Sequence, residues 1–168
     1  MPNLFEPDFD STNDRPGFAW RRAKLGDQAD SHRLGASLYE LEPGSAPFPL
    51  HYHHSNEELL IVVAGRPSLR TPDDERELET GEVVAFPVGE RGAHQVVNRN
   101  SEPAQVLIVS EMNSPDVVVR PESGKLSAFT RPPGGSGAWG HDVFWKRDAA
   151  EFWDGEDPPP PPPGDDEQ

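Results

Sequence analysis

The stretch His51-Tyr52-His53-His54-Ser55-Asn56-Glu57-Glu58, followed by an apolar run over residues 59–64 and by Gly65, indicates both a fold and a site. Side chains alternate between the two faces of a β-strand, so His51 and His53 share one face. Glu58 lies beyond a turn at residues 55–56 and can rejoin that face from the start of the next strand. This stretch therefore brings two imidazoles and a carboxylate together.

A second segment supplies a third imidazole. Residues 81–89 read Gly-Glu-Val-Val-Ala-Phe-Pro-Val-Gly, and His94 and Asn98 follow. Imidazole and carboxylate ligands suit Fe, Mn, Zn, Ni or Cu, and geometry selects among these metals more than ligand type does. The pattern predicts one divalent transition metal held by His51, His53, Glu58 and His94 inside a small β-barrel. The alternative is that these histidines only pack.

Both segments resemble the two motifs of the cupin superfamily. The first motif is usually G-x5-H-x-H-x(3,4)-E-x6-G, and here it runs from Gly44 to Gly65 with one extra residue after Gly44. The second is usually G-x5-P-x-G-x2-H-x3-N, and here it runs from Gly81 to Asn98 with two extra residues within 90–93. The insertion lengthens a turn, so the position of His94 is the least defined by sequence. The resemblance covers residues 34–119 and implies an all-β fold, the cupin double-stranded β-helix or jelly-roll barrel.

Two adjacent glutamates compete for the carboxylate position. The six residues between Glu58 and Gly65 favour Glu58, which leaves Glu57 as the alternative and as a solvated charge. Strand alternation places His54 outside the metal site. His32 in a polar loop and His141 near the C-terminus are expected at the surface.

The same alternation predicts the wall of a ligand pocket. If Glu58 points inward, its strand neighbours on that face do so too, and the same holds around His94. An apolar cavity with a polar floor is the usual profile of a small-molecule site. The expected pocket residues are Phe48 (or Pro49), Leu60, Val62, Phe86, Val96 and Asn98. Pro87 and Gly89 are expected to form a turn.

Composition restricts the partners. The chain of 168 residues has 30 acidic and 15 basic residues, a formal net charge of −15. This charge opposes binding to nucleic acids and to anionic membranes, which need basic patches. The chain has no cysteine, so disulfides and thiolate ligands are excluded. No signal peptide is visible, and the longest apolar run is too short to span a bilayer. We therefore expect a cytoplasmic protein.

The pattern of apolar segments and turns divides the chain into four parts. These are an N-terminal arm (1–16), a β-barrel domain (17–130), a linker with an aromatic segment (131–157) and a disordered proline-rich acidic tail (158–168). One short helix is expected near 149–154, and the aromatic residues around it are expected to pack on the barrel or on a partner subunit. Strands are predicted at 18–25, 34–41, 48–53, 58–64, 68–71, 76–78, 82–86, 94–98, 104–110 and 117–120.

The predicted function is a metal-binding single-domain cupin that acts on or binds an unidentified small molecule. The resemblance implies oxygenase, decarboxylase or isomerase chemistry. The fold alone does not select one of these three reactions. A non-catalytic sensor or ligand-binding module is the alternative. No arginine or lysine adjoins the ligands in sequence, so nothing here indicates a phosphorylated sugar. A homodimer is expected, because the strand after Glu58 is apolar on both faces and needs cover outside the barrel.

Overall fold

The computed structural model describes residues 1–130 and 140–158, and within these ranges almost all regular structure is β-strand. The strands are β1 (Ser11–Asn13), β2 (Trp20–Ala23), β3 (Leu34–Leu41), β4 (Tyr52–His53), β5 (Glu58–Ala64), β6 (Ser68–Arg70), β7 (Glu75–Glu77), β8 (Val83–Phe86), β9 (Gln95–Val97), β10 (Ala104–Glu111), β11 (Asp116–Arg120), β12 (Lys125–Thr130) and β13 (Gly140–Trp145). The helical turns are α1 (Leu25–Gln28), η1 (Glu90–Gly92) and η2 (Lys146–Asp148).

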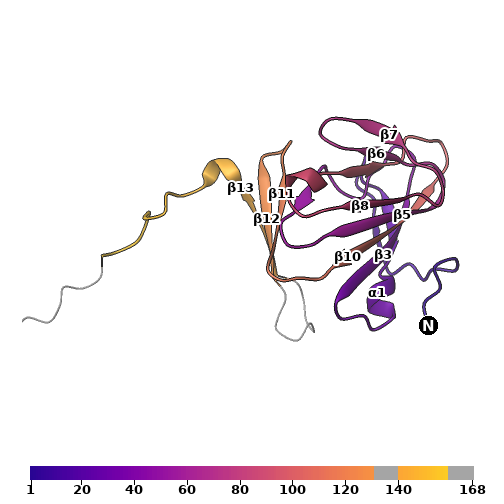
Figure 1. The fold of residues 1–168 in the computed structure, drawn as a ribbon, viewed down its shortest axis with the longest axis horizontal. Helices are drawn as coiled ribbons and strands as arrows, with labels where there is room; N and C mark the ends of the chain where they lie inside the picture. The colour runs from indigo at the N-terminus through magenta and orange to yellow at the C-terminus, as the bar shows by residue number, and fades with distance from the viewer. Residues whose placement is uncertain (131–139, 159–168) are drawn as a thin grey trace, which may run out of the picture.

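These strands form three antiparallel sheets (Figure 1). The largest has the order β1-β2-β3-β10-β5-β8, the second β13-β12-β11-β4 and the third β7-β6-β9. β5 is rich in Leu, Ile and Val, which favour strands, and it pairs with both β10 and β8. The predicted all-β barrel is therefore confirmed.

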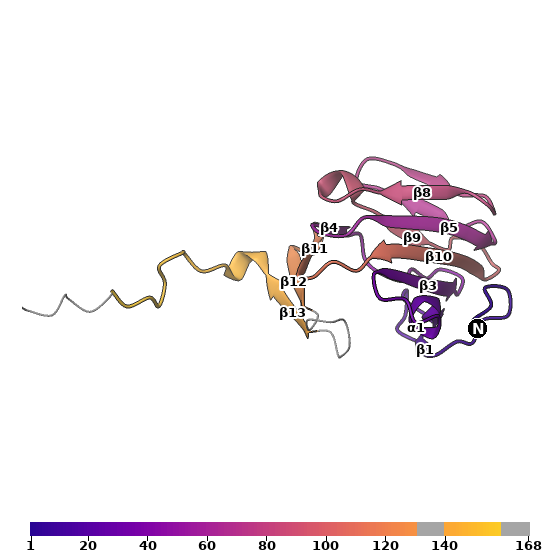
Figure 2. The same ribbon diagram turned by 60° about the horizontal axis from the view of Figure 1, so that its bottom comes forward.

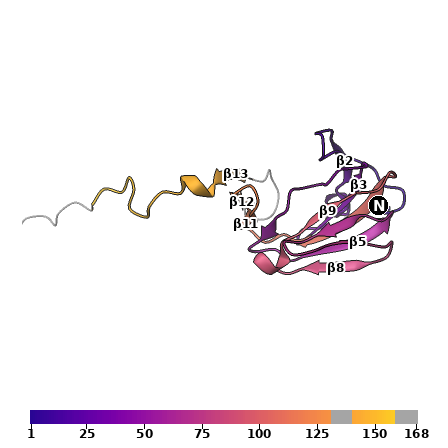
Figure 3. The same cartoon turned by 90° about the horizontal axis from the view of Figure 1, so that it is seen from above.

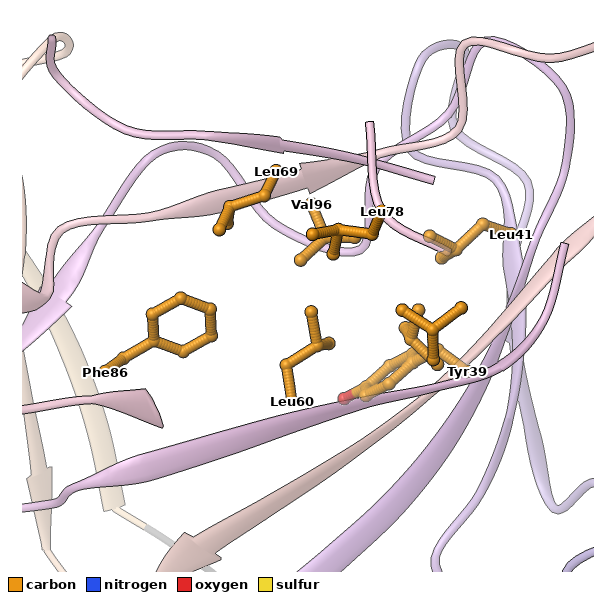
Figure 4. Packing of buried hydrophobic residues seen from close by; sticks show 9 residues of the cluster. Tyr39, Leu41, Leu60, Leu69, Leu78, Phe86 and Val96 are labelled. Atoms are coloured by element: carbon orange, nitrogen blue, oxygen red, sulfur yellow. The ribbon is translucent and has the colours of Figure 1, made fainter. Parts of the chain in front are cut away.

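The main core lies between the six-stranded and the three-stranded sheets (Figure 4). Tyr39, Leu60 and Phe86 project from the large sheet toward Leu69 and Val96 of the small one. Leu60 is fully buried, and burying a side chain of this size contributes about 2 kcal/mol. This packing closes one end of the barrel and leaves the other end for the site.

A second cluster covers the outside of the large sheet. Leu38 and Leu107, which are paired across β3 and β10, point away from the main core and pack with Leu25 of α1. Leu4 and Phe9 from the N-terminal segment also pack here, and α1 lies against β3 (Figure 2). The N-terminal arm is thus part of the folded unit, and β1 extends the large sheet. The predicted strand at 18–25 is shorter than expected, because α1 begins at Leu25.

The C-terminal segment projects from the barrel (Figures 1 and 3). β13 pairs with β12, and the sequence pattern predicts neither of these two strands. Phe144, Trp145, Phe152 and Trp153 are exposed, so they do not pack on the barrel as expected. The helix predicted near 149–154 is wrong, since only the 3-10 turn η2 forms, just before it. The linker at 131–137 and the tail beyond Pro158 lie outside the described residues.

The helical segments of residues 1–130 and 140–158 are all too short to cross a membrane.

Candidate metal centre

Three histidines and one glutamate meet at the open end of the barrel. His51 and His53 lie at β4, and Glu58 is the first residue of β5. His94 lies opposite His51, because the two residues exchange backbone hydrogen bonds of 3.1 and 2.9 Å. The sequence-distant segments around both motifs are therefore fixed to each other by backbone pairing.

The side chains converge on one carboxylate oxygen. Glu58 Oε2 lies 3.4 Å from His53 Nε2, 3.5 Å from His94 Nε2 and 4.0 Å from His51 Nε2. The ligand atoms of His51, His53 and Glu58 all lie within 4.8 Å of one another, close enough to share one metal ion. His94 does not belong to this tight group, although it approaches the same oxygen.

The other ring nitrogen of each histidine has a partner of its own. Nδ1 of His51 lies 2.9 Å from the Pro49 carbonyl, and Nδ1 of His94 lies 2.8 Å from the Gly92 carbonyl. A carbonyl oxygen only accepts, so each Nδ1 carries the proton and each Nε2 keeps its lone pair. This is the tautomer that a metal ligand bound through Nε2 requires.

Asp116 supplies the same arrangement for His53. Its Oδ2 lies 2.6 Å from His53 Nδ1 and also accepts from Asn56 Nδ2, and its Oδ1 accepts from the Ser55 backbone N–H. Carboxylates behind a metal-ligating histidine fix the ring and raise its basicity. Asp116 is a site residue that the sequence reasoning missed, because it lies 63 residues from His53 and outside both motifs.

Burial sets the protonation of the imidazoles. It lowers the pKa of His51 well below its ordinary value, and it lowers the pKa of His94 to about 4. For His53, burial acts in the same direction, but the hydrogen bond and charge of Asp116 together with Glu58 outweigh it and raise the pKa. Burial and then the Asp116 charge raise the pKa of Glu58, against the pull of His53. His51 and His94 are therefore neutral at pH 7, as metal ligands must be.

The two-residue insertion before His94 has a structural role. Residues 90–92 form η1, whose last carbonyl, that of Gly92, binds His94 Nδ1. A Cβ at Gly92 would lie 1.9 Å from the Pro87 carbonyl oxygen, so only glycine fits. The His94 ring also stacks on Phe86, with ring centroids 3.6 Å apart. The insertion thus orients the His94 ring, whose Nε2 approaches the same Glu58 oxygen as the other two imidazoles.

Glu57 and Glu58 have different surroundings. Glu58 lies inside the histidine cluster, whereas Glu57 is exposed and its backbone N–H bonds to Glu111. We expect Glu58→Gln to weaken metal binding by more than about tenfold, since it removes the one anionic ligand. Glu57→Gln is the matched control and should leave affinity unchanged. Isothermal titration with Zn²⁺ or Mn²⁺ measures the affinity of both variants. Equal losses of affinity would show that the assignment of Glu58 as the carboxylate ligand is wrong.

A cavity of about 450 Å³ opens beside the cluster and is bordered by His51, His53, Glu58 and Phe48. The other expected wall residues lie elsewhere. Leu60, Val62, Phe86 and Val96 pack in the main core and do not border the cavity. Asn98 is fully buried and donates to the Leu41 and Glu102 carbonyls, so it holds a turn.

Three cations border this cavity that the sequence did not associate with the ligands. Arg22 comes from β2, Lys24 lies just before α1, and Arg120 ends β11. Tyr39 and Ser110 also border the cavity. The absence of basic residues near the ligands in sequence was therefore a poor guide, because folding brings them in from distant strands.

The donor set fits a divalent transition metal. Imidazole Nε2 atoms with fixed tautomers and one carboxylate are nitrogen and oxygen ligands of the kind that Zn, Fe, Mn, Ni and Cu accept, and His51, His53 and Glu58 could hold one such ion. Asp116 and the two backbone carbonyls complete the hydrogen bonding of all three rings.

Fold and site together define a β-barrel protein with a candidate histidine–glutamate metal centre beside a small-molecule cavity. Residues 37–110 match the family model of the cupin domain. The chain therefore contains a cupin domain, as the two motifs indicated. No curated protein matches the chain.

Solved structures share this fold. The "Putative sugar phosphate isomerase" from Acidithiobacillus ferrooxidans is 26% identical, with a TM-score of 0.69 over 82% of this chain and 83% of that one. The sugar phosphate isomerase from Silicibacter pomeroyi is 23% identical, with a TM-score of 0.74 over 92% and 98%. The polyketide cyclase RemF from Streptomyces resistomycificus is 26% identical, with a TM-score of 0.50 over 67% and 74%.

Proposed function

We propose that this chain is a metal-dependent cupin enzyme that isomerises a small hydroxy-carbonyl compound. The observation that carries the metal part is the convergence of the three Nε2 atoms on Glu58, with each Nδ1 already engaged. His51, His53, His94 and Glu58 would hold the ion. A bound metal would supply Lewis-acid polarisation of a carbonyl or hydroxyl oxygen.

The cavity offers a proton donor, Tyr39, which one aromatic ring separates from the cluster. Burial raises the pKa of Tyr39, although Arg22 acts against it, so the phenol is protonated at pH 7. Tyr39 reaches His51 through edge contacts with Phe48, at centroid distances of 5.6 and 5.7 Å. A neutral phenol at this position can donate to an oxygen on which negative charge develops. The similarity to a protein named as a sugar phosphate isomerase also favours isomerisation.

Isomerisation leaves a signature that does not depend on knowing the product. Moving hydrogen between neighbouring carbons through a solvent-exchangeable proton incorporates deuterium from D₂O. We expect the metal-loaded protein to label at least one member of a panel of aldose and ketose phosphates, as measured by NMR. Chelation with EDTA should stop the labelling, and readdition of metal should restore it.

The panel also addresses the alternative of a non-catalytic ligand-binding protein. Binding of a panel member by calorimetry without any exchange or turnover would favour that alternative. His54→Ala is a suitable control for general damage, because His54 is exposed and lies outside the cluster. It should label substrate at the rate of the unaltered protein.

We further infer a homodimer. The N-terminal segment covers part of the outer sheet face, but Val83 at the β8 edge stays 57% exposed and the aromatic side chains of the C-terminal segment are uncovered. An isologous two-fold contact is the commonest way to bury such surfaces. Light scattering at micromolar concentration should give twice the 18.5 kDa chain mass. A mass near 18.5 kDa would contradict the dimer.

A further inference from the structure

Two arginines face the cavity without a carboxylate partner. Arg22 Nε donates to the Ser11 hydroxyl at 3.0 Å, and Arg120 Nη1 donates to the hydroxyl of fully buried Ser127. Both guanidinium groups are half-buried, and both border the cavity. Within residues 1–130 and 140–158, neither forms an ion pair with an acidic side chain. Arg22 Nη1 also approaches the Tyr39 hydroxyl at 3.5 Å, so both guanidinium groups donate to neutral hydroxyl groups.

This contrasts with arginines elsewhere on the protein. Five of them, all outside the cavity, form ion pairs with a glutamate, namely Arg21, Arg66, Arg70, Arg76 and Arg99. The chain has twice as many acidic as basic residues, so carboxylates are abundant. Among the described residues, Arg15, Arg33 and Arg91 also form no ion pair, but all three are exposed to solvent, whereas Arg22 and Arg120 are half-buried and border the cavity.

The acidic groups that border the cavity are engaged elsewhere. Asp116 accepts from His53, and Glu58 lies among the imidazoles. Glu111 accepts from the Glu57 backbone and from Asn113, and Asp27 is exposed. The cavity therefore keeps cationic hydrogen-bond donors for a ligand, while its carboxylates serve the metal centre and the chain.

Arg120 lies close to the metal end of the cavity. After burial and the neighbouring imidazoles, its charge also contributes to the low pKa of His51. Burial alone lowers the pKa of Arg120 itself, which reflects the cost of holding this cation without a counter-ion. An anionic ligand would relieve that cost, and guanidinium groups bind carboxylate and phosphate oxygens in a bidentate manner.

We propose that the cavity takes a small anionic substrate whose phosphate or carboxylate group is bound by Arg120 and Arg22. This proposal deepens the proposed function. It rests on that function because it assumes that the reacting end of the substrate lies at the metal centre. The arginines belong to different sheets, β2 in the largest sheet and β11 in the second, so the subsite forms only when the barrel is assembled.

The test is calorimetric binding of three related probes to the metal-loaded protein. Glucose 6-phosphate carries a phosphate, gluconate a carboxylate, and glucose neither. We expect at least one anionic probe to bind and glucose not to bind at the same concentrations. Which anion binds more tightly distinguishes phosphate from carboxylate recognition. Arg120→Gln and Arg22→Gln should each weaken that binding by about tenfold or more.

Arg99→Gln is the control, since it removes an exposed arginine that pairs with Glu75 on the surface. It should leave binding unchanged. Metal content, measured in parallel by elemental analysis, should stay the same in all three variants, which separates loss of the anion subsite from loss of the metal. If the metal assignment fails, the same titrations on chelated protein still test the arginines.

Equal affinity for glucose and for the anionic probes would overturn the proposal. So would unchanged anion binding in both cavity variants, or no binding of either anion up to about 10 mM, which exceeds the usual range of substrate affinities. Circular dichroism checks that each variant is folded, and two separate variants keep the test valid if one of them is not.

Discussion

Replacing both His51 and His53 by alanine is expected to abolish metal binding. The two residues supply half of the converging ligand set, and the ion would be left with His94 and Glu58 only. Elemental analysis after dialysis against Mn²⁺ or Zn²⁺ should fall from about one equivalent to background, since one ion binds per site. Deuterium labelling of any substrate should be lost with it.

The double variant also has a thermal consequence. Added metal raises the melting temperature of a protein that binds it when folded, and this rise should vanish in the variant. His54→Ala removes an exposed histidine of the same segment that lies outside the cluster, and it should retain both the metal and the thermal shift. Full occupancy in the double variant would refute the metal assignment, whatever its activity.

Asp116→Asn is expected to weaken metal binding by roughly 10 to 100-fold, the usual effect of losing a carboxylate behind a ligating histidine. Asp116 accepts hydrogen bonds on both oxygens, from His53, Asn56 and the Ser55 backbone. An amide turns one of these acceptors into a donor that faces another donor. We therefore also expect the folded state to lose about 1–3 kcal/mol of stability.

Two readouts separate positioning of His53 from simple damage. In chelated protein, NMR titration should show that the pKa of His53 is lower in the variant, because the Asp116 hydrogen bond and charge help to raise it. Asp73→Asn changes an exposed aspartate in a turn and should alter neither metal affinity nor stability. An unchanged His53 pKa together with unchanged metal affinity would show that Asp116 does not support this ligand.

The local part of this site could be read from the sequence. Strand alternation and the spacing to Gly65 placed Glu58 rather than Glu57 among the histidines, and β5 occupies the predicted residues. The isolated antiparallel bridge between His51 and His94 follows the same logic less directly, because it depends on how two hairpins meet. Short-range geometry is encoded by neighbouring residues and is therefore accessible.

The position of a side chain along the barrel axis could not be predicted from the sequence. Leu60 and Val62 share the inward face with Glu58, but that face runs from the open cavity into the closed core. Alternation predicts which way a side chain points and not how far it lies from the opening. For the same reason Asn98, on the predicted inward face, serves a turn instead of the cavity.

Site residues that are distant in sequence from the histidines could not be predicted either. Asp116, Arg22 and Arg120 join the site from strands whose position depends on the sheet order β2-β3 and β11-β4. A single buried aspartate ahead of an apolar run is not distinguishable by sequence from a turn residue. Its role becomes visible only once β11 pairs beside β4 and brings it to His53.

The short strand β1 has a consequence for solubility. It is three residues long, polar and paired on one side only, so it forms the outer border of the largest sheet. A short polar edge strand of this kind presents few free backbone groups to another chain. Removing the first thirteen residues would uncover the longer β2 and strip Leu4 and Phe9 from the sheet face behind it. The N-terminal arm is thus expected to prevent edge-to-edge aggregation of the largest sheet.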